Sequence, residues 1–217
     1  MSKYGYIGKE SVVPQQAFKA NAGVLSVNDH LALSQEDKLT QFGQLELIET
    51  VTLGSDTASI IFDEIQADKY NVHFITYNNC VMDSSGNRIK LRFFESGVEE
   101  TASVYQYALQ GANSSGTFSE AKSTGQDNIH LGANTQVSGE WADNGYIYIY
   151  NAGDSTKYTF TTQHLITNYS VGSHVRSFFG GGALPQNSSV DRIKLYASNG
   201  NIELGMSASL YGIKEYS

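Results

Sequence analysis

The residues best suited to acid–base chemistry are three glutamates in a short stretch, Glu95, Glu99 and Glu100. A glycosidase needs two carboxyl groups held about 5 Å or about 6.5–9.5 Å apart across a cleft. These glutamates surround a Ser-Gly turn between two expected strands, where charged side chains usually face water. We therefore expect no catalytic residue here, and a hydrolase is the least favoured class of function.

The sequence contains equally weak candidates for a metal or cofactor site. No two of the five histidines have the H-x-H or H-x-x-x-H spacing that brings two ring nitrogens to one metal. The stretch Asp83–Arg88 lacks the alternating acidic ligands and the final glutamate of a calcium loop. Asp143–Gly145 and Asp154–Thr156 are interpreted as turns, with metal binding as a remote alternative. The chain has neither a P-loop nor a G-x-S-x-G motif. We expect no metal and no cofactor, and we expect Cys80 to be a buried hydrophobic residue, not a reactive thiol.

A row of tyrosines is the strongest candidate for a binding surface. In Gly145–Tyr150, Ile147 and Ile149 alternate with Tyr146, Tyr148 and Tyr150, so a strand that buries the isoleucines would present three phenol rings on its outer side. Together with Trp141, these rings could stack on sugars or on a protein partner. The alternative is an outer sheet face that lies under the N-terminal segment or a loop.

Composition and charge narrow the class of protein. Of the 217 residues only 17% are charged, 21 are glycine and 2 are proline, which is typical of a β-sandwich with many turns. The net charge of −8 and the absence of any Lys/Arg cluster argue against nucleic-acid binding. The chain contains no apolar run of the roughly 18 residues that a membrane span requires, and residues 1–10 lack the apolar core of a signal peptide. We expect synthesis in the cytoplasm and no membrane association.

Residues 1–42 are predicted to form an N-terminal arm, because they show no sustained period of 2 or 3.6 residues. Short apolar islands nevertheless recur in this segment, which predicts that it docks on its own domain or on a neighbouring chain. The residues that we expect to make these attachment contacts are Tyr4, Tyr6, Ile7, Val12, Val13, Val24, Leu25, Leu31 and Leu33.

Residues 43–217 are predicted to form one all-β domain, an antiparallel, jelly-roll-like β-sandwich of ten to twelve short strands. We expect Gln110–Asp127 to be a long loop and Gly180–Gly182 to interrupt the strand before it. Val190–Ala197 and Ile202–Ile213 are predicted to pair as a closing β-hairpin, with Leu204 in the core.

Five segments, in order and spacing, resemble a family of structural proteins of tailed-bacteriophage virions, from environmental and often marine phages. They are Gly23–Leu33, Tyr70–Phe74, Ile89–Gly97, Asp191–Leu195, and Gly200–Gly205 running into Leu210–Ile213. In that family an arm with the pattern "Gvlsvnd" leads into a β-sandwich whose last strand ends in LYGI. The resemblance identifies no functional residue and does not distinguish head from tail.

The resemblance implies a non-enzymatic capsid or tail component, such as an appendage, a fibre or a decoration protein, located in the virion. Its partners would be other virion proteins and further copies of itself; trimers are common among such appendages. The alternative function is a carbohydrate-binding module at the tip of a fibre, which would recognise a glycan on the host surface.

Overall fold

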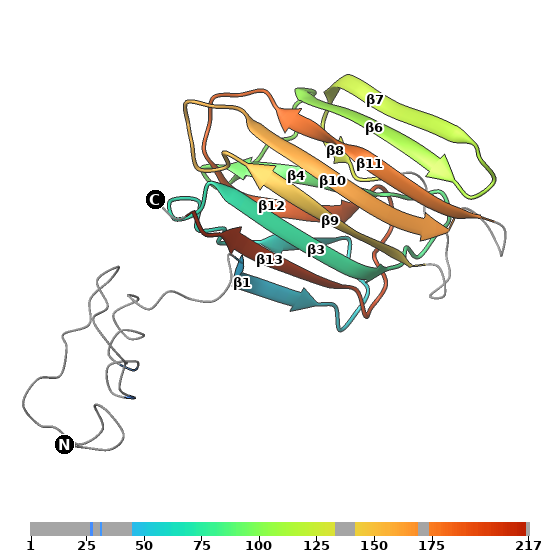
Figure 1. The fold of residues 1–217 in the computed structure, drawn as a ribbon, viewed down its shortest axis with the longest axis horizontal. Coiled ribbons are helices and arrows are strands. Elements are labelled where there is room, and N and C mark those ends of the chain that lie inside the picture. The colour runs from blue at the N-terminus through green and yellow to red at the C-terminus, as the bar shows by residue number, and fades with distance from the viewer. Residues whose placement is uncertain (1–26, 28–30, 32–44, 133–141, 169–173, 216–217) are drawn as a thin grey trace, which may run out of the picture. The chain divides into compact units, whose positions relative to one another are not determined.

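The computed structural model describes residues 27, 31, 45–132, 142–168 and 174–215 (Figure 1). The chain divides into two compact units, Met1–Gln44 and Leu45–Ser217. Of the predicted attachment residues only Leu31 is described, and 57% of its surface is exposed. The other eight lie outside the described residues, so the fold presented below is that of the second unit.

Within its described residues, the second unit consists of thirteen β-strands. They are β1 (Leu45–Thr52), β2 (Ser59–Phe62), β3 (Val72–Cys80), β4 (Ile89–Glu95), β5 (Val98–Glu99), β6 (Tyr105–Asn113), β7 (Phe118–Gln126), β8 (Ile129–His130), β9 (Asp143–Tyr150), β10 (Thr159–Asn168), β11 (Val175–Leu184), β12 (Val190–Ala197) and β13 (Ser207–Ile213).

These strands form two antiparallel sheets. The larger has eight strands in the order β1-β13-β3-β9-β10-β11-β6-β7, and the smaller has the order β2-β12-β4-β5, with β8 also paired to β4. Figure 1 looks onto the larger sheet, with β4, β8 and β12 of the smaller sheet behind it. The two sheets enclose one hydrophobic core.

The pairing of eight of the strands is that of a jelly roll. β1 pairs with β13, β2 with β12, β3 with β9 and β4 with β8, and successive pairs alternate between the larger and the smaller sheet. The pair β10–β11 and the pair β6–β7 extend the larger sheet beyond this nested set. The predicted all-β, antiparallel, jelly-roll-like sandwich is therefore confirmed.

Strict alternation of side chains explains why these segments are strands with one buried face. In β9, Ile147 and Ile149 are fully buried, and the tyrosines between them point to the other side of the sheet, as predicted. In β12, Ile193 and Leu195 fill the opposite wall of the core. Cys80 is also fully buried and free, and burial raises the pKa of its thiol well above the usual value.

The predicted closing hairpin is wrong. β12 lies in the smaller sheet between β2 and β4, whereas β13 lies in the larger sheet between β1 and β3, so the Asn-Gly turn leads from one sheet to the other. Leu204, predicted to lie in the core, lies in this connection with 64% of its surface exposed. The positive φ angles of Gly200 and Gly205, 66° and 91°, show that glycine is needed for the backbone there.

Three other predictions of loops and turns are also wrong. β6 continues to Asn113, and β7 occupies most of the expected loop. β7 is an edge strand without a single buried residue, so its sequence lacks a clear apolar face. Gly180–Gly182 lies inside β11, where a Cβ atom on Gly181 would come within 2.2 Å of the Thr161 carbonyl oxygen. Asp143, expected in a turn, is instead the buried first residue of β9.

Candidate functional site: an aromatic sheet face

The outer side of the larger sheet carries a cluster of aromatic rings. Phe74 lies at its centre, with its ring centroid 4.6 Å from that of Tyr148, 5.9 Å from that of Tyr146 and 6.2 Å from that of Tyr211. Tyr150 stacks beside Tyr148 at 6.4 Å with an interplanar angle of 19°. We call the outward side of β13, β3, β9 and β10 the aromatic face.

The register of the sheet sets the positions of these rings. Phe74 stands opposite Tyr148 on β9 and opposite Tyr211 on β13. Tyr150 stands opposite Phe160 on β10, and its hydroxyl lies 3.0 Å from the Thr162 hydroxyl. Neighbouring strands are about 4.8 Å apart, so the pairing holds the rings at regular intervals across the strands.

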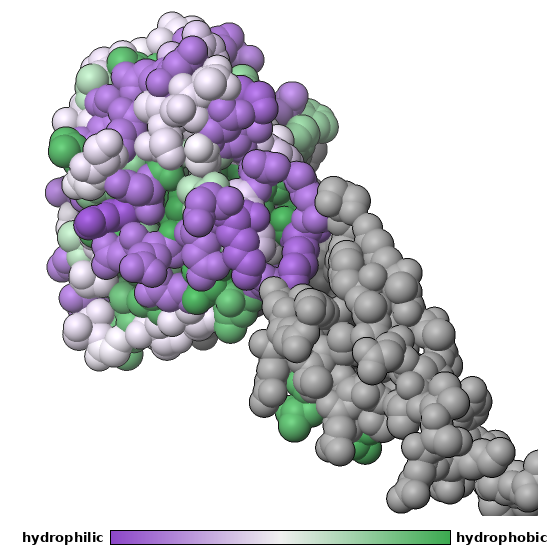
Figure 2. All heavy atoms as spheres, turned by 90° about the vertical axis from the view of Figure 1, so that its left-hand side faces the viewer, coloured by the Kyte–Doolittle hydropathy of each residue, from purple (hydrophilic) through white to green (hydrophobic). Residues whose placement is uncertain are grey.

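The aromatic face carries neither an acidic side chain nor a lysine or arginine. Its outward residues are Ser207, Ser209, Tyr211, Ile213, Val72, Phe74, Thr76, Asn78, Asn144, Tyr146, Tyr148, Tyr150, Phe160, Thr162, His164, Ile166 and Asn168. His164 is the one titratable nitrogen base among them, and its Nε2 lies 2.6 Å from the Ser177 hydroxyl. The end of the sandwich shown in Figure 2 differs from this face: hydrophilic residues gather across its middle, with residues of intermediate hydropathy above and below and apolar residues among them and at the edges.

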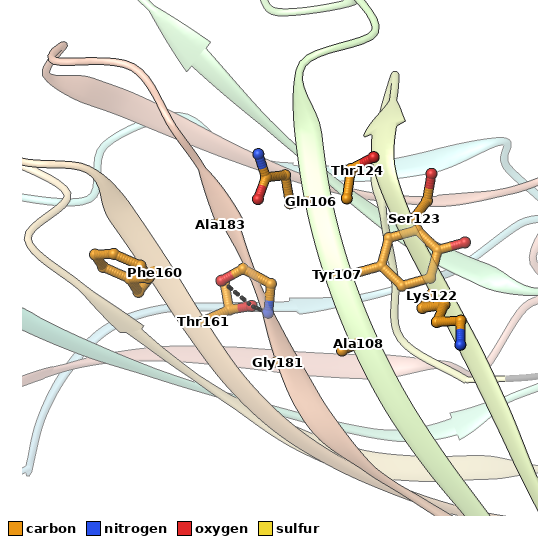
Figure 3. Close-up of a pocket in the computed structure, with 11 residues that line it drawn as sticks. Gln106, Tyr107, Ala108, Lys122, Ser123, Thr124, Phe160, Thr161, Gly181 and Ala183 are labelled. Carbon is orange, nitrogen blue, oxygen red and sulfur yellow. Dashed lines mark hydrogen bonds between the residues drawn. The ribbon is translucent and has the colours of Figure 1, made fainter.

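A shallow groove of about 810 Å³ adjoins the aromatic face at Phe160. Gly181 and Ala183 of β11 form its floor; Phe160 stands on one side, and side chains of β6 and β7 stand on the other (Figure 3). We call it the Gly181 groove. Its volume lies within the roughly 300–1,000 Å³ that is usual for small-ligand sites.

The sequence predicts only some of the aromatic residues of this surface. It identified Tyr146, Tyr148 and Tyr150, which the structure brings together, whereas Trp141 lies outside the described residues. It missed Phe74 and Phe160. The alternation of Phe74 with His73 and Ile75 was a usable signal, but both faces of that strand are apolar or aromatic, so the sequence does not show which side is outside.

The three candidate glutamates do not converge on one another. Arg92 and Lys194 bind the Glu99 carboxylate at 2.8 Å each. Burial alone would raise the pKa of Glu99, but these hydrogen bonds outweigh it and lower the pKa. Glu95 accepts a hydrogen bond from the Ser188 hydroxyl, and Glu100 accepts one from the backbone N–H of Ala102.

Three of the four described histidines, His73, His130 and His164, have structural partners. Nε2 of the buried His73 lies 2.7 Å from the Ile65 carbonyl oxygen, and burial lowers the pKa of this ring. Burial and the nearby cation of Arg88 lower the pKa of His130 to about 4.

Among the described residues no three His, Cys, Asp or Glu side chains are grouped as metal ligands would be. Within the same residues, no helix is long and apolar enough to cross a lipid bilayer.

Comparison with known proteins identified no relative: no family model matches the chain, and no curated protein or solved structure matches it significantly.

Proposed function

We propose that this chain is a non-enzymatic structural component of a tailed-bacteriophage virion, a capsid or tail appendage or decoration protein anchored through residues 1 to about 42. The observation that carries the proposal is the set of five family-like segments in the same order and spacing. The fold gives these segments structural roles. Asp191–Leu195 lies in β12, Leu210–Ile213 lies in β13, and Gly200 and Gly205 form turns.

The division of the chain also supports this proposal. The compact sandwich begins at Leu45, immediately after the segment that the sequence assigns to attachment. Low surface charge suits contacts within a particle exposed to salt, since such contacts depend little on ion pairs that salt would screen.

Deletion of residues 2–33 in the phage genome tests the proposal. The truncated protein should fold and remain soluble but should be missing from purified particles, as measured by quantitative mass spectrometry against the major capsid protein. Incorporation of the truncated protein at normal copy number would refute anchoring by the arm, and absence of the full-length protein from wild-type particles would refute the virion role.

We propose glycan recognition as a second candidate function, because the aromatic face presents flat rings and hydroxyl groups. Aromatic rings offer large apolar area at a low entropic cost, and sugars present matching C–H surfaces. Adsorption of the intact protein to purified host envelope tests this function directly, and a failure to adsorb would count against it without affecting the virion role.

A further inference from the structure

The Gly181 groove exists because consecutive outward positions of the sheet carry very small side chains. Gly181 stands opposite Ala108 of β6, and Ala183 is the next outward residue of β11. On either side, Phe160 of β10 and Lys122 of β7 have large side chains. The floor is therefore backbone and methyl groups, which a flat ligand can approach closely.

Two rows of paired residues connect the tyrosines to this groove. One row runs from Tyr150 through Phe160 and Ala183 to Gln106. The other runs from Phe74 through Tyr148, Thr162 and Gly181 to Ala108, and then to Lys122. Both rows cross the strands at steps of about 4.8 Å. This step is close to the length of one pyranose unit in a glycan chain.

The far wall of the groove has polar groups available for a ligand. The side chains of Gln106 and Thr124 are exposed and make no hydrogen bond with any described residue. An amide offers both donors and an acceptor, and a hydroxyl offers one donor and two lone pairs, which matches the alternating groups of a sugar. The ammonium of Lys122 lies 2.7 Å from the Glu120 carboxylate, so its charge is already paired.

The charge of this surface selects among glycans. The aromatic face has no carboxylate, lysine or arginine, and the whole chain carries a net charge of −8. An acidic polysaccharide would find no cation on the aromatic face, would meet in the groove only Lys122, which is paired with Glu120, and would be repelled by the protein as a whole. A neutral glycan would experience no such repulsion.

We propose that these two rows bind a neutral hexopyranose chain that runs across β9, β10 and β11. One sugar stacks on Tyr150 and Phe160, and the next occupies the Gly181 groove with its hydroxyls bonded to Gln106 and Thr124. This inference rests on the second candidate function above and specifies its site and ligand class. A second copy of the protein fits less well, because a flat sheet partner would leave a groove of about 810 Å³ unfilled and two polar side chains unpaired.

The test uses the full chain, a panel of neutral gluco-, galacto- and manno-oligosaccharides, and acidic oligosaccharides of the same lengths, with binding measured by titration calorimetry. Phe160→Ala removes the stacking ring and should weaken binding of a neutral oligosaccharide about tenfold. Ala183→Leu fills the groove and should abolish binding.

Phe179→Ala is the matched control. Phe179 lies on β11, the strand of Ala183, and points outward as Ala183 does; 50% of its surface is exposed. It does not line the groove, so removal of its ring should leave the affinity for the oligosaccharide unchanged. Gln106→Ala, at an exposed position without partners, replaces Ala183→Leu if that variant does not fold, and should weaken binding severalfold.

Each alternative outcome overturns a distinct claim. Binding that survives both Phe160→Ala and Ala183→Leu would place the glycan elsewhere and overturn this site while leaving glycan recognition intact. Binding of acidic oligosaccharides alone would overturn the ligand class. No binding to any oligosaccharide would overturn glycan recognition itself. A change of oligomeric mass in Phe160→Ala or Ala183→Leu, measured by light scattering without ligand, would assign the face to contacts between copies.

Discussion

Replacing Asp143 by asparagine should remove a strong pH dependence from the stability of the sandwich. Asp143 is the first residue of β9, stands opposite Cys80 of β3, and is fully buried. Its carboxyl oxygens make no hydrogen bond with any described residue. Burial raises the pKa of this carboxyl to about 7, and the neighbouring Thr167 side chain offsets only part of that effect.

The sign and size of the effect follow from the protons bound in each state. Well below pH 4, Asp143 is largely protonated in both the folded and the unfolded chain, so it contributes nothing to the pH dependence of stability there. Between about pH 4 and pH 7 the folded state keeps a proton that the unfolded state has lost, so the free energy of unfolding falls as pH rises. A shift from 3.8 to about 7, at about 1.4 kcal/mol per pH unit, corresponds to about 4 kcal/mol lost by pH 8. This is an upper bound, because a charged Asp143 can draw in water.

The assay is urea unfolding followed by intrinsic fluorescence from about pH 4 to about pH 9. Asp143→Asn should lie close to wild type near pH 4 and exceed its free energy of unfolding by up to about 4 kcal/mol near pH 8. Asp68→Asn, at an exposed position, serves as the control and should follow the wild-type curve. Parallel curves for wild type and Asp143→Asn across this range would refute the assignment of a buried, proton-binding carboxyl.

Three further predictions concern the packing of the sandwich. Lysine partners and the Tyr70 hydroxyl lower the pKa of Glu46 to about 2. Glu46→Gln should therefore lower the free energy of unfolding, measured with urea, by about 1 kcal/mol at pH 7, and this loss should shrink as pH falls from about 4 toward 2. An equal loss at pH 7 and at pH 2 would contradict the prediction. Gly212→Ala should destabilise by about 1–3 kcal/mol in thermal melts, because its Cβ would lie 2.3 Å from the Tyr70 ring. Gly54→Ala, with nothing within 4 Å, should change little, and equal losses at the two glycines would exclude the clash as the cause. The Cys80 thiol should react with Ellman's reagent only at the rate of opening of the sandwich, and rapid labelling of the native protein would contradict its burial.

The parts of the fold that the sequence predicts well are strands with one apolar face. β4 and β9 alternate clearly, so their positions and buried sides can be read directly from the residues. The position of β7 cannot be read from its residues in this way, because an edge strand buries little surface and needs no apolar pattern. The glycines of β11 indicate a break by local rules, but the close approach of neighbouring backbones requires them inside a strand.

Pairing between distant segments is what local patterns cannot give. An Asn-Gly turn between two strands favours a hairpin, yet here the turn leads into the other sheet, because β12 and β13 find partners about 100 or more residues earlier in the chain. The same limit applies to the aromatic face. The tyrosines of β9 are visible in one segment, whereas Phe74 and Phe160 join them only through the register of β3 and β10.

The position of β13 constrains the order of events during folding. β13 is synthesised after the other twelve strands that the structure describes, yet it lies inside the larger sheet between β1 and β3, where Leu45 pairs with Ile213. The nascent chain therefore exposes two unpaired strand edges until synthesis has passed β13. Such non-local closure makes folding slow, and the open edges favour aggregation meanwhile. Chains that end before β13 should accumulate as aggregates or be degraded, whereas loss of the edge strand β7 should be tolerated far better.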